Sequence, residues 1–188
     1  MRDFKPELKT YSPETLPSAY EHQIRSFVRI EWFDLYQNSL EGVIARPEYN
    51  PMHFVLVEAD ALYSSANVMQ TSLEHQNQTY ISYGLGGVFT YPAFRKRGYG
   101  AWVVGSATDY IRQRADADIA VLWTLKHNIA FYEKLGWEHT SQIQMNIGDP
   151  ENPYRSAENL MMLFISEKAK NNRRQFEQSP VYFGIHSW

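Results

Sequence analysis

The chain has 188 residues and a formal net charge of −3, with 44% hydrophobic and 15% aromatic residues. This size and content predict one folded domain, or a domain with a tail, and exclude a disordered chain. The mildly acidic balance gives no sign of nucleic acid or an anionic membrane as a partner, and the absence of cysteine excludes disulfides, thiolate zinc sites and a cysteine nucleophile.

The first half of the chain predicts helices followed by an antiparallel meander. The N-terminal segment MRDFKPELKT has no apolar stretch of the signal-peptide kind, and no apolar run reaches the roughly 20 residues of a membrane helix, so we expect a soluble, cytoplasmic protein. A short strand is expected at residues 8–11, a helix at 18–32 and a weaker helix at 34–44. The strands expected to form the meander are residues 53–58, 62–73 and 79–90.

The second half alternates helices with strands. A helix is expected at residues 98–115, followed by the nearly all-apolar strand 118–124, whose composition suits a parallel strand covered on both faces. A short helix ends at Gly136, and the last strands are expected at 142–147 and 159–165. This order predicts an α/β (α+β) fold with a mixed sheet and a central β-α-β crossover. We expect a single domain over residues 1–165 and a tail, 166–188, that packs on it or completes a site.

A basic, glycine-containing turn carries the strongest chemical signal. The segment PAFRKRGYGA, residues 92–101, follows a predicted strand and opens a predicted helix. Backbone N–H groups at a helix N-terminus and the helix dipole favour an anion, and Gly98 and Gly100 allow a phosphate to approach the backbone. The segment has neither the Gly-Lys-Ser/Thr of a P-loop nor the Gly-x-Gly-x-x-Gly of dinucleotide sites. The alternative is a solvated basic turn.

Glycines also interrupt the third strand of the meander, at positions 84, 86 and 87. Glycine inside a strand usually marks a bulge or the close approach of another backbone. We therefore expect a strand that separates from its neighbour and leaves backbone groups for a ligand, with a merely weak strand as the alternative.

Two motifs together resemble those of the GNAT superfamily of acyl-CoA-dependent N-acetyltransferases. Pro92-x-x-Arg95-x-x-Gly98-x-Gly100, after a strand ending Val88-Phe89-Thr90, is similar to the acetyl-CoA motif of that family. Downstream, AFYEKLGW at residues 130–137 is similar to its second motif. The likeness covers residues 52–163 and implies a GNAT-like mixed sheet in which strands 4 and 5 are splayed. It also implies acetyl-CoA as cosubstrate and no metal.

The resemblance assigns roles to residues of both motifs. The pantetheine arm would pair with the backbone of Val88, Phe89 and Thr90, and backbone N–H groups near Gly86 would polarise the carbonyl. Tyr132 resembles the tyrosine that donates a proton to the departing thiolate, with packing beside Phe131 as its alternative role. The residues implied to hold the pyrophosphate are Arg95, Lys96, Arg97, Gly98, Tyr99, Gly100 and Ala101.

The general base is not evident. Many relatives carry an asparagine seven residues before the motif tyrosine, where this chain has Leu125, and a glutamate on the fourth strand, whereas residues 81–90 contain no carboxylate. Each remaining candidate is also compatible with an ordinary surface or packing role. These candidates are Glu58, Glu74, His75, His127, His186 and the terminal carboxylate of Trp188.

The acceptor is expected to be a primary amine on a small molecule. Asp34 and Tyr36 lie in an acidic, aromatic stretch that could be an amine-binding wall or a partly buried amphipathic helix. The long third strand, the stretch from Tyr83 to Val88, the FYEKLGW motif and a chain that ends in Trp188 give a weaker likeness to aminoglycoside 2′-N-acetyltransferases. The candidate acceptor site consists of Asp34, Tyr36, Gly86 and Trp188. Two alternatives remain, an acyl-CoA-binding sensor without turnover and a protein or peptide N-acetyltransferase. The resemblance leaves a homodimer open.

Overall fold

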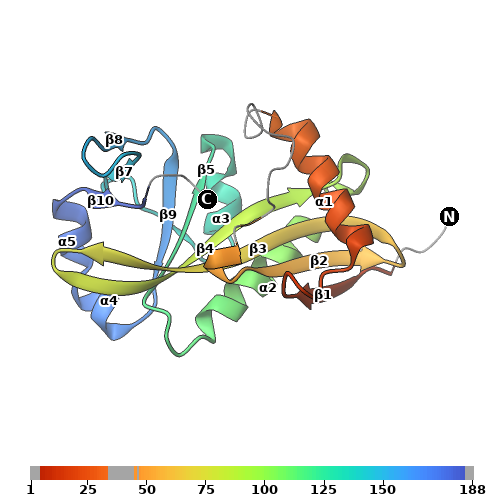
Figure 1. The fold of residues 1–188 in the computed structure, drawn as a ribbon, viewed down its shortest axis with the longest axis horizontal. Coiled ribbons are helices and arrows are strands. Elements are labelled where there is room, and N and C mark those ends of the chain that lie inside the picture. Colours follow the sequence, from red (N-terminus) through yellow and green to blue (C-terminus); the bar gives the residue numbers. More distant parts are fainter. Residues whose placement is uncertain (1–4, 34–44, 46, 185–188) are drawn as a thin grey trace. The chain divides into compact units, whose positions relative to one another are not determined.

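The computed structural model of the protein describes residues 5–33, 45 and 47–184 (Figure 1). The chain divides into two compact units. Unit 1 combines the residues up to Met69 with Gly86–Ala107, and unit 2 combines Gln70–Leu85 with the chain from Thr108 onward. The predicted helix at 34–44 lies outside the described residues.

The helices and strands follow the predicted order closely in the first two thirds of the chain. The helices are α1 (Ser18–Glu31), α2 (Tyr99–Arg112), α3 (Ile129–Glu133), α4 (Glu167–Asn171) and α5 (Arg173–Gln178), with short 3-10 turns η2 (Pro47–Tyr49), η3 (Pro92–Phe94) and η4 (Lys126–Asn128). The strands are β1 (Glu7–Tyr11), β2 (Met52–Glu58), β3 (Ala61–His75), β4 (Gln78–Thr90), β5 (Ile119–Thr124), β6 (Glu138–His139), β7 (Met145–Ile147), β8 (Tyr154–Arg155), β9 (Asn159–Phe164) and β10 (Val181–Tyr182).

Strand pairing makes the predicted mixed sheet. Within the described residues the strand order is β1-β2-β3-β4-β5-β9-β6, and a smaller sheet has the order β10-β7-β8. β1–β2, β2–β3 and β5–β9 pair antiparallel, whereas β4 and β5 pair in parallel across the crossover through α2. The α/β fold class with its N-terminal meander and central crossover is therefore confirmed.

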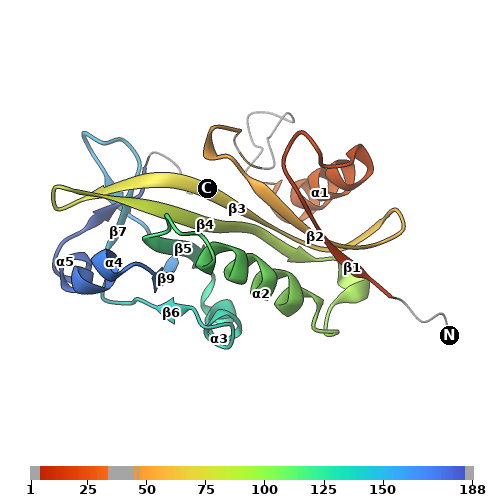
Figure 2. The same ribbon diagram turned by 90° about the horizontal axis from the view of Figure 1, so that it is seen from below.

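The core of unit 1 lies between α1 and one face of the meander. Tyr20, Ile24, Phe27 and Val28 recur at helical spacing, are buried, and pack on a cluster that includes Phe89. The rings of Phe27 and Phe89 are stacked with centroids 4.0 Å apart. α1 lies on one face of these strands and the start of α2 on the other (Figure 2). Helices therefore lie on both faces of these strands, and α1 packs directly on Phe89 near the end of β4.

The core of unit 2 surrounds β5, whose residues are almost all buried. β5 pairs with β4 over Ser82–Gly84 and with β9 along its whole length, which explains its continuous apolar run. The segment after residue 165 contributes the fully buried Phe176, whose ring contacts His75 and Tyr80. The residues of α4 and α5 are therefore part of this core.

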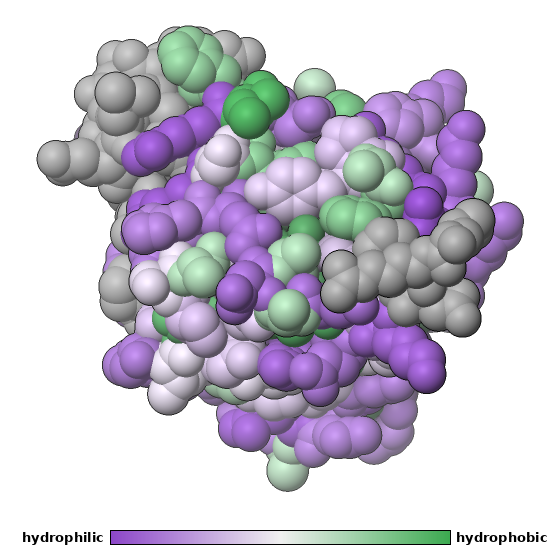
Figure 3. Space-filling model, turned by 90° about the vertical axis from the view of Figure 1, so that its right-hand side faces the viewer, coloured by the Kyte–Doolittle hydropathy of each residue, from purple (hydrophilic) through white to green (hydrophobic). Residues whose placement is uncertain are grey.

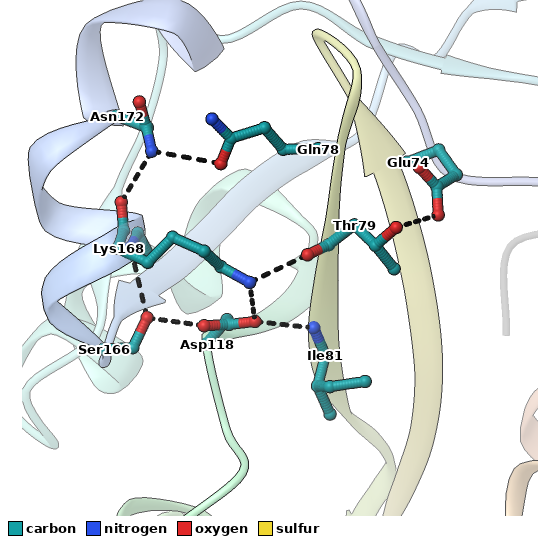
Figure 4. Close-up of polar contacts among 9 residues, drawn as sticks. Glu74, Gln78, Thr79, Ile81, Asp118, Ser166, Lys168 and Asn172 are labelled. Atoms are coloured by element: carbon teal, nitrogen blue, oxygen red, sulfur yellow. Dashed lines mark hydrogen bonds and ion pairs between the residues drawn. The ribbon is translucent and has the colours of Figure 1, made fainter.

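A buried carboxylate fastens α4 to β4 and β5 (Figure 4). Asp118 accepts hydrogen bonds from Ser166 Oγ and Lys168 Nζ, both at 2.6 Å, and from Ile81 N at 2.9 Å. Lys168 also donates to Thr79 O at 2.8 Å. Burial alone would raise the pKa of Asp118, but the hydrogen bonds from these three residues and the Lys168 charge lower it below its usual value.

The strand predicted at 142–147 is shorter than expected and lies in a different sheet. Its observed part, β7, pairs in parallel with β10 and antiparallel with β8, outside the main sheet. The alternation of Ile143, Met145 and Ile147 predicts a strand with one buried face, but periodicity does not identify the pairing partner. The two-residue strands β6, β8 and β10 carry too little pattern to be predicted.

Apolar side chains on the surface are scattered. Ile30, Phe33 and Trp102 in unit 1 are exposed. On the face drawn in Figure 3, apolar residues form small groups separated by hydrophilic ones. Single exposed apolar residues are normal on soluble domains and identify no interface.

No helix in the described part of the chain is long and apolar enough to cross a membrane.

Candidate active site

The basic turn has a backbone shape suited to an anion. After η3, Lys96 (φ 62°) and Gly98 (φ 80°) adopt left-handed conformations, and α2 begins at Tyr99. The first helical bond runs from Trp102 N to Gly98 O at 3.0 Å, so the amides at the start of α2 have no acceptor within the helix. A Cβ at Gly98 would meet nothing within 4 Å. The turn therefore offers open space and aligned N–H donors, as the predicted phosphate site requires.

The three basic residues of the turn differ in their contacts. The Arg95 side chain donates from Nε to Thr90 O at 3.0 Å, and its Nη2 lies 4.0 Å from Glu31 Oε2. Arg95 is thus directed toward the end of β4 and toward α1, which favours a role in shaping the turn. Lys96 and Arg97 are exposed on the turn itself and add positive charge there.

The backbone carbonyl groups at the end of β4 already accept hydrogen bonds from side chains. Ser64 Oγ donates to Phe89 O at 2.7 Å, and Arg95 occupies Thr90 O. Because a carbonyl oxygen has two lone pairs, these groups keep acceptor capacity. Val88 is half-buried, and the parallel pairing of β4 with β5 stops at Gly84, six residues before β4 ends. The predicted pantetheine contacts at residues 88–90 stay a prediction.

Gly87 has a left-handed backbone conformation that favours glycine. Its φ is 58°, and a Cβ there would lie 2.6 Å from Asn67 Nδ2. Any larger residue would therefore combine backbone strain with a clash against a buried side chain. The close neighbour of Gly87 is thus a side chain and not another backbone, and the predicted role of the strand glycines in ligand contact stays a prediction.

Tyr132 belongs to unit 2 and sits in the motif that resembles the family's second signature. It is 7% exposed, and its ring lies edge-on to Phe131 with centroids 5.0 Å apart. Burial raises the pKa of Tyr132 to about 12. Its hydroxyl therefore keeps its proton at neutral pH and can act as a donor.

The candidate bases with described contacts take part in structural interactions. Glu58 accepts from the Tyr63 hydroxyl, and Glu74 accepts from Thr79 Oγ1 at 2.5 Å in the β3–β4 hairpin. His75 Nε2 lies 3.1 Å from Gln175 O and stacks on Phe176. His127 is exposed in η4. The other candidates, His186 and Trp188, lie outside the described residues, as do the acceptor candidates Asp34 and Tyr36.

Sequence reasoning missed two buried polar residues in unit 1, His53 on β2 and Asn67 on β3. Each is 3% exposed, and His53 Nδ1 and Asn67 Oδ1 have no hydrogen-bond partner within the described residues. The available signal was a histidine beside the apolar run of β2, and an asparagine in the central part of β3. Within residues 5–33, 45 and 47–184, no cluster of three or more potential metal ligands is present.

Comparison with known proteins identifies the family. The model of the acetyltransferase (GNAT) domain matches residues 7–140, well over half of the chain. The chain therefore belongs to the GNAT acetyltransferase family, as its two motifs predict. None of the curated proteins matches the sequence significantly.

Solved structures agree in fold at low sequence identity. Escherichia coli ElaA is 14% identical, with a TM-score of 0.58 over 84% of this chain and 99% of its own. A GNAT family acetyltransferase from Brucella melitensis, in complex with acetyl-CoA, is 17% identical, with a TM-score of 0.57 over 86% and 89%. An aminoglycoside 6′-N-acetyltransferase complexed with coenzyme A is 14% identical, with a TM-score of 0.60 over 85% and 97%.

Proposed function

We propose that the protein transfers the acetyl group of acetyl-CoA to a primary amine of a small molecule. The observation that carries the proposal is the turn before α2, where Lys96 and Gly98 are left-handed and a Cβ at Gly98 would meet nothing. The family supports the reaction. The similar structures with bound acetyl-CoA or coenzyme A support the cosubstrate, and the aminoglycoside enzyme supports a small-molecule acceptor.

In this proposal the pyrophosphate is bound mainly by backbone. The amides of Gly98, Tyr99 and Gly100 would donate to it, and the exposed Lys96 and Arg97 would supply charge without tight geometry. Arg95 would position the turn through its bond to Thr90 O. Acetyl-CoA supplies an activated thioester, so the residues of the protein need to bind, orient and move protons.

The first test is calorimetric titration of acetyl-CoA into the purified protein, with adenosine as the control ligand. We expect saturable one-site binding to acetyl-CoA and none to adenosine at the same concentration. Thiol release in the presence of a panel of small amines then measures turnover, without background because the chain has no cysteine. Binding without turnover on any amine would favour a sensor, and no binding at millimolar acetyl-CoA would overturn the proposal.

Tyr132→Phe tests the proposed proton donor. We expect kcat to fall about 100-fold, since removal of a general acid costs of this order, while the Kd for acetyl-CoA changes little. Because the pKa of Tyr132 is raised to about 12, the wild type should show no basic limb from this residue up to about pH 11. The exposed Tyr154 provides the control, and Tyr154→Phe should leave kcat unchanged. An unchanged kcat in Tyr132→Phe would assign the residue to packing.

A further inference from the structure

His53 and Asn67 form a buried polar pair in unit 1, on the face of β2 and β3 that also carries Val55 and the buried Ser65. They stand directly opposite each other in the antiparallel pairing of β2 with β3. Side chains alternate along β2, and Val55 and Val57 belong to the core under α1, so His53 faces α1 as well. Asn67 in turn lies against β4, because its side-chain amide occupies the space that a Cβ at Gly87 would fill.

The two side chains present hydrogen-bonding atoms that the described residues leave unpaired. Buried polar atoms are nearly always hydrogen-bonded, and an unsatisfied one destabilises the fold. Here His53 Nδ1 and Asn67 Oδ1 are both unpaired on neighbouring, almost fully buried residues. A carboxamide oxygen is an acceptor, and so is Nδ1 of a neutral imidazole in the tautomer that carries the ring proton on Nε2. The pair is therefore complementary to a small group with several N–H donors.

We propose that His53 Nδ1 and Asn67 Oδ1 bind the ammonium group of the acceptor, and that His53 is the general base that takes its proton. This inference rests on the proposed acetyl transfer and supplies the base that β4 lacks. It also limits the acceptor to a primary amine whose substituents are narrow enough for the amino group to reach His53 and Asn67. Asn67 orients the amine, and its contact with Gly87 directs the amine toward the glycine stretch of β4.

The surroundings of His53 keep its imidazole neutral. Burial lowers the pKa of His53, and the nearby Glu21 on α1 opposes this in part. Glu21 is itself held by Arg25, whose Nε and Nη2 lie 3.0 and 2.7 Å from Glu21 Oε1. On the flanking strands Tyr11 stands opposite His53 on β1, and Asn67 on β3 is uncharged. A neutral imidazole is the form that can accept a proton.

The proposed reaction is balanced in protons and electrons without a further reactant. An alkylammonium, with a pKa of about 10.4 for a lysine-like amine, gives one proton to His53 and becomes a nucleophile. Its nitrogen lone pair forms the C–N bond to the acetyl carbon, and the C–S bond breaks with its electron pair on sulfur. The thiolate takes a proton from Tyr132, the proposed donor, and the proton that the nitrogen releases as it becomes an amide restores the Tyr132 hydroxyl. His53 returns its proton to solvent.

Amine binding is measured by NMR without turnover. In the complex with coenzyme A, n-butylamine is titrated while the imidazole signals and the Asn67 side-chain amide are followed, with His53→Gln used to assign the His53 ring. We expect saturable shifts of both groups in the wild type and no saturable shift of Asn67 in His53→Gln. His75→Gln is the control, because that buried histidine already has its partners in Gln175 and Ser179, and it should respond like the wild type.

Turnover separates a base from a structural residue. At pH 7, His53→Gln should lower kcat/KM for n-butylamine at least 100-fold, but change that for hydroxylamine, which is uncharged at this pH, less than threefold. His53→Leu should melt at the same or a higher temperature than the wild type, since it removes an unpaired buried polar atom. The profile of kcat/KM for n-butylamine should lose its acidic limb in His53→Gln.

Three outcomes would overturn the inference. These are an absence of amine-induced shifts at His53 and Asn67, equal loss of activity on both nucleophiles, and a marked fall in the melting temperature of His53→Leu. Acetyl-CoA calorimetry on the same samples separates this inference from the proposed function. If the wild type binds acetyl-CoA but shows no response to the amine, only the proposed role of His53 is contradicted. If the wild type does not bind acetyl-CoA, the proposed function itself is contradicted.

Discussion

Gly98→Phe is expected to weaken acetyl-CoA binding at least 100-fold while leaving the protein folded. A Cβ at this position meets nothing within 4 Å, so the phenyl ring has room in the free protein. The same open space lies at the start of α2, where a pyrophosphate would approach the backbone amides, so the ring and the phosphate exclude each other. The backbone cost of φ 80° in a non-glycine residue is about 1–2 kcal/mol, which lowers stability but does not unfold a domain.

The matched control for this strain is Gly184→Phe. Gly184 also has a positive φ, 106°, and an added Cβ there also meets nothing within 4 Å. Both variants should lose a similar amount of thermal stability, and calorimetry should show wild-type acetyl-CoA affinity for Gly184→Phe alone. If Gly98→Phe retained full affinity, the turn would be a solvated helix start and the site would have to be sought elsewhere. Equal weakening in both variants would point to a general effect of strain.

The part of the site that sequence predicts best is the part built from local backbone. The turn at 92–101 combines a helix start with glycines at fixed spacing, and these features depend on neighbours in the chain. The structure gives Gly98 the left-handed backbone that this motif needs. The helix at 18–32 is predicted for the same reason, because its buried residues follow a local period.

The candidate base could not be predicted, because it depends on register between strands. His53 opens an apolar strand and resembles an ordinary edge residue in the sequence. Its position opposite Asn67, and the approach of Asn67 to Gly87, are set by pairing across β2, β3 and β4. A shift of one residue would turn either side chain to the other face of the sheet. The sequence of the fourth strand therefore gives no indication of either residue.

The contacts at the end of the chain depend on distant residues as well. The sequence predicts a tail at 166–188 that packs on the domain or completes a site, but the run of Lys168, Lys170, Arg173 and Arg174 does not indicate which residues it contacts. Lys168 reaches the buried Asp118, and Arg173 pairs with Glu138 at 2.7 Å. Composition shows that these side chains are charged but not that their partners lie 50 and 35 positions away in the sequence.

Asp118→Asn is expected to lower the free energy of unfolding by about 1.5–3 kcal/mol, the range for hydrogen bonds to charged groups. Asp118 is 8% exposed and accepts from Ser166, Lys168 and Ile81, whereas an asparagine has one acceptor oxygen and a competing amide donor. Urea denaturation of both proteins at pH 7 measures the difference. The surface pair of Glu167 with Lys170 is the control, because the Glu167 side chain is 82% exposed. Glu167→Gln should cost less than about 0.5 kcal/mol.

The pH dependence gives a second and independent measurement of the same contact. Because the folded-state pKa of Asp118 is lowered, its contribution is complete above the unfolded value of about 3.9 and is lost as the pH falls through the folded value. The stability difference between wild type and Asp118→Asn should therefore be constant from pH 7 to about pH 5 and shrink below about pH 4. A stability difference that stayed constant through this acidic range would contradict this expectation. It would mean that the charge of Asp118 contributes nothing to holding α4 in place, and that only the shape of the side chain and the number of its hydrogen bonds matter.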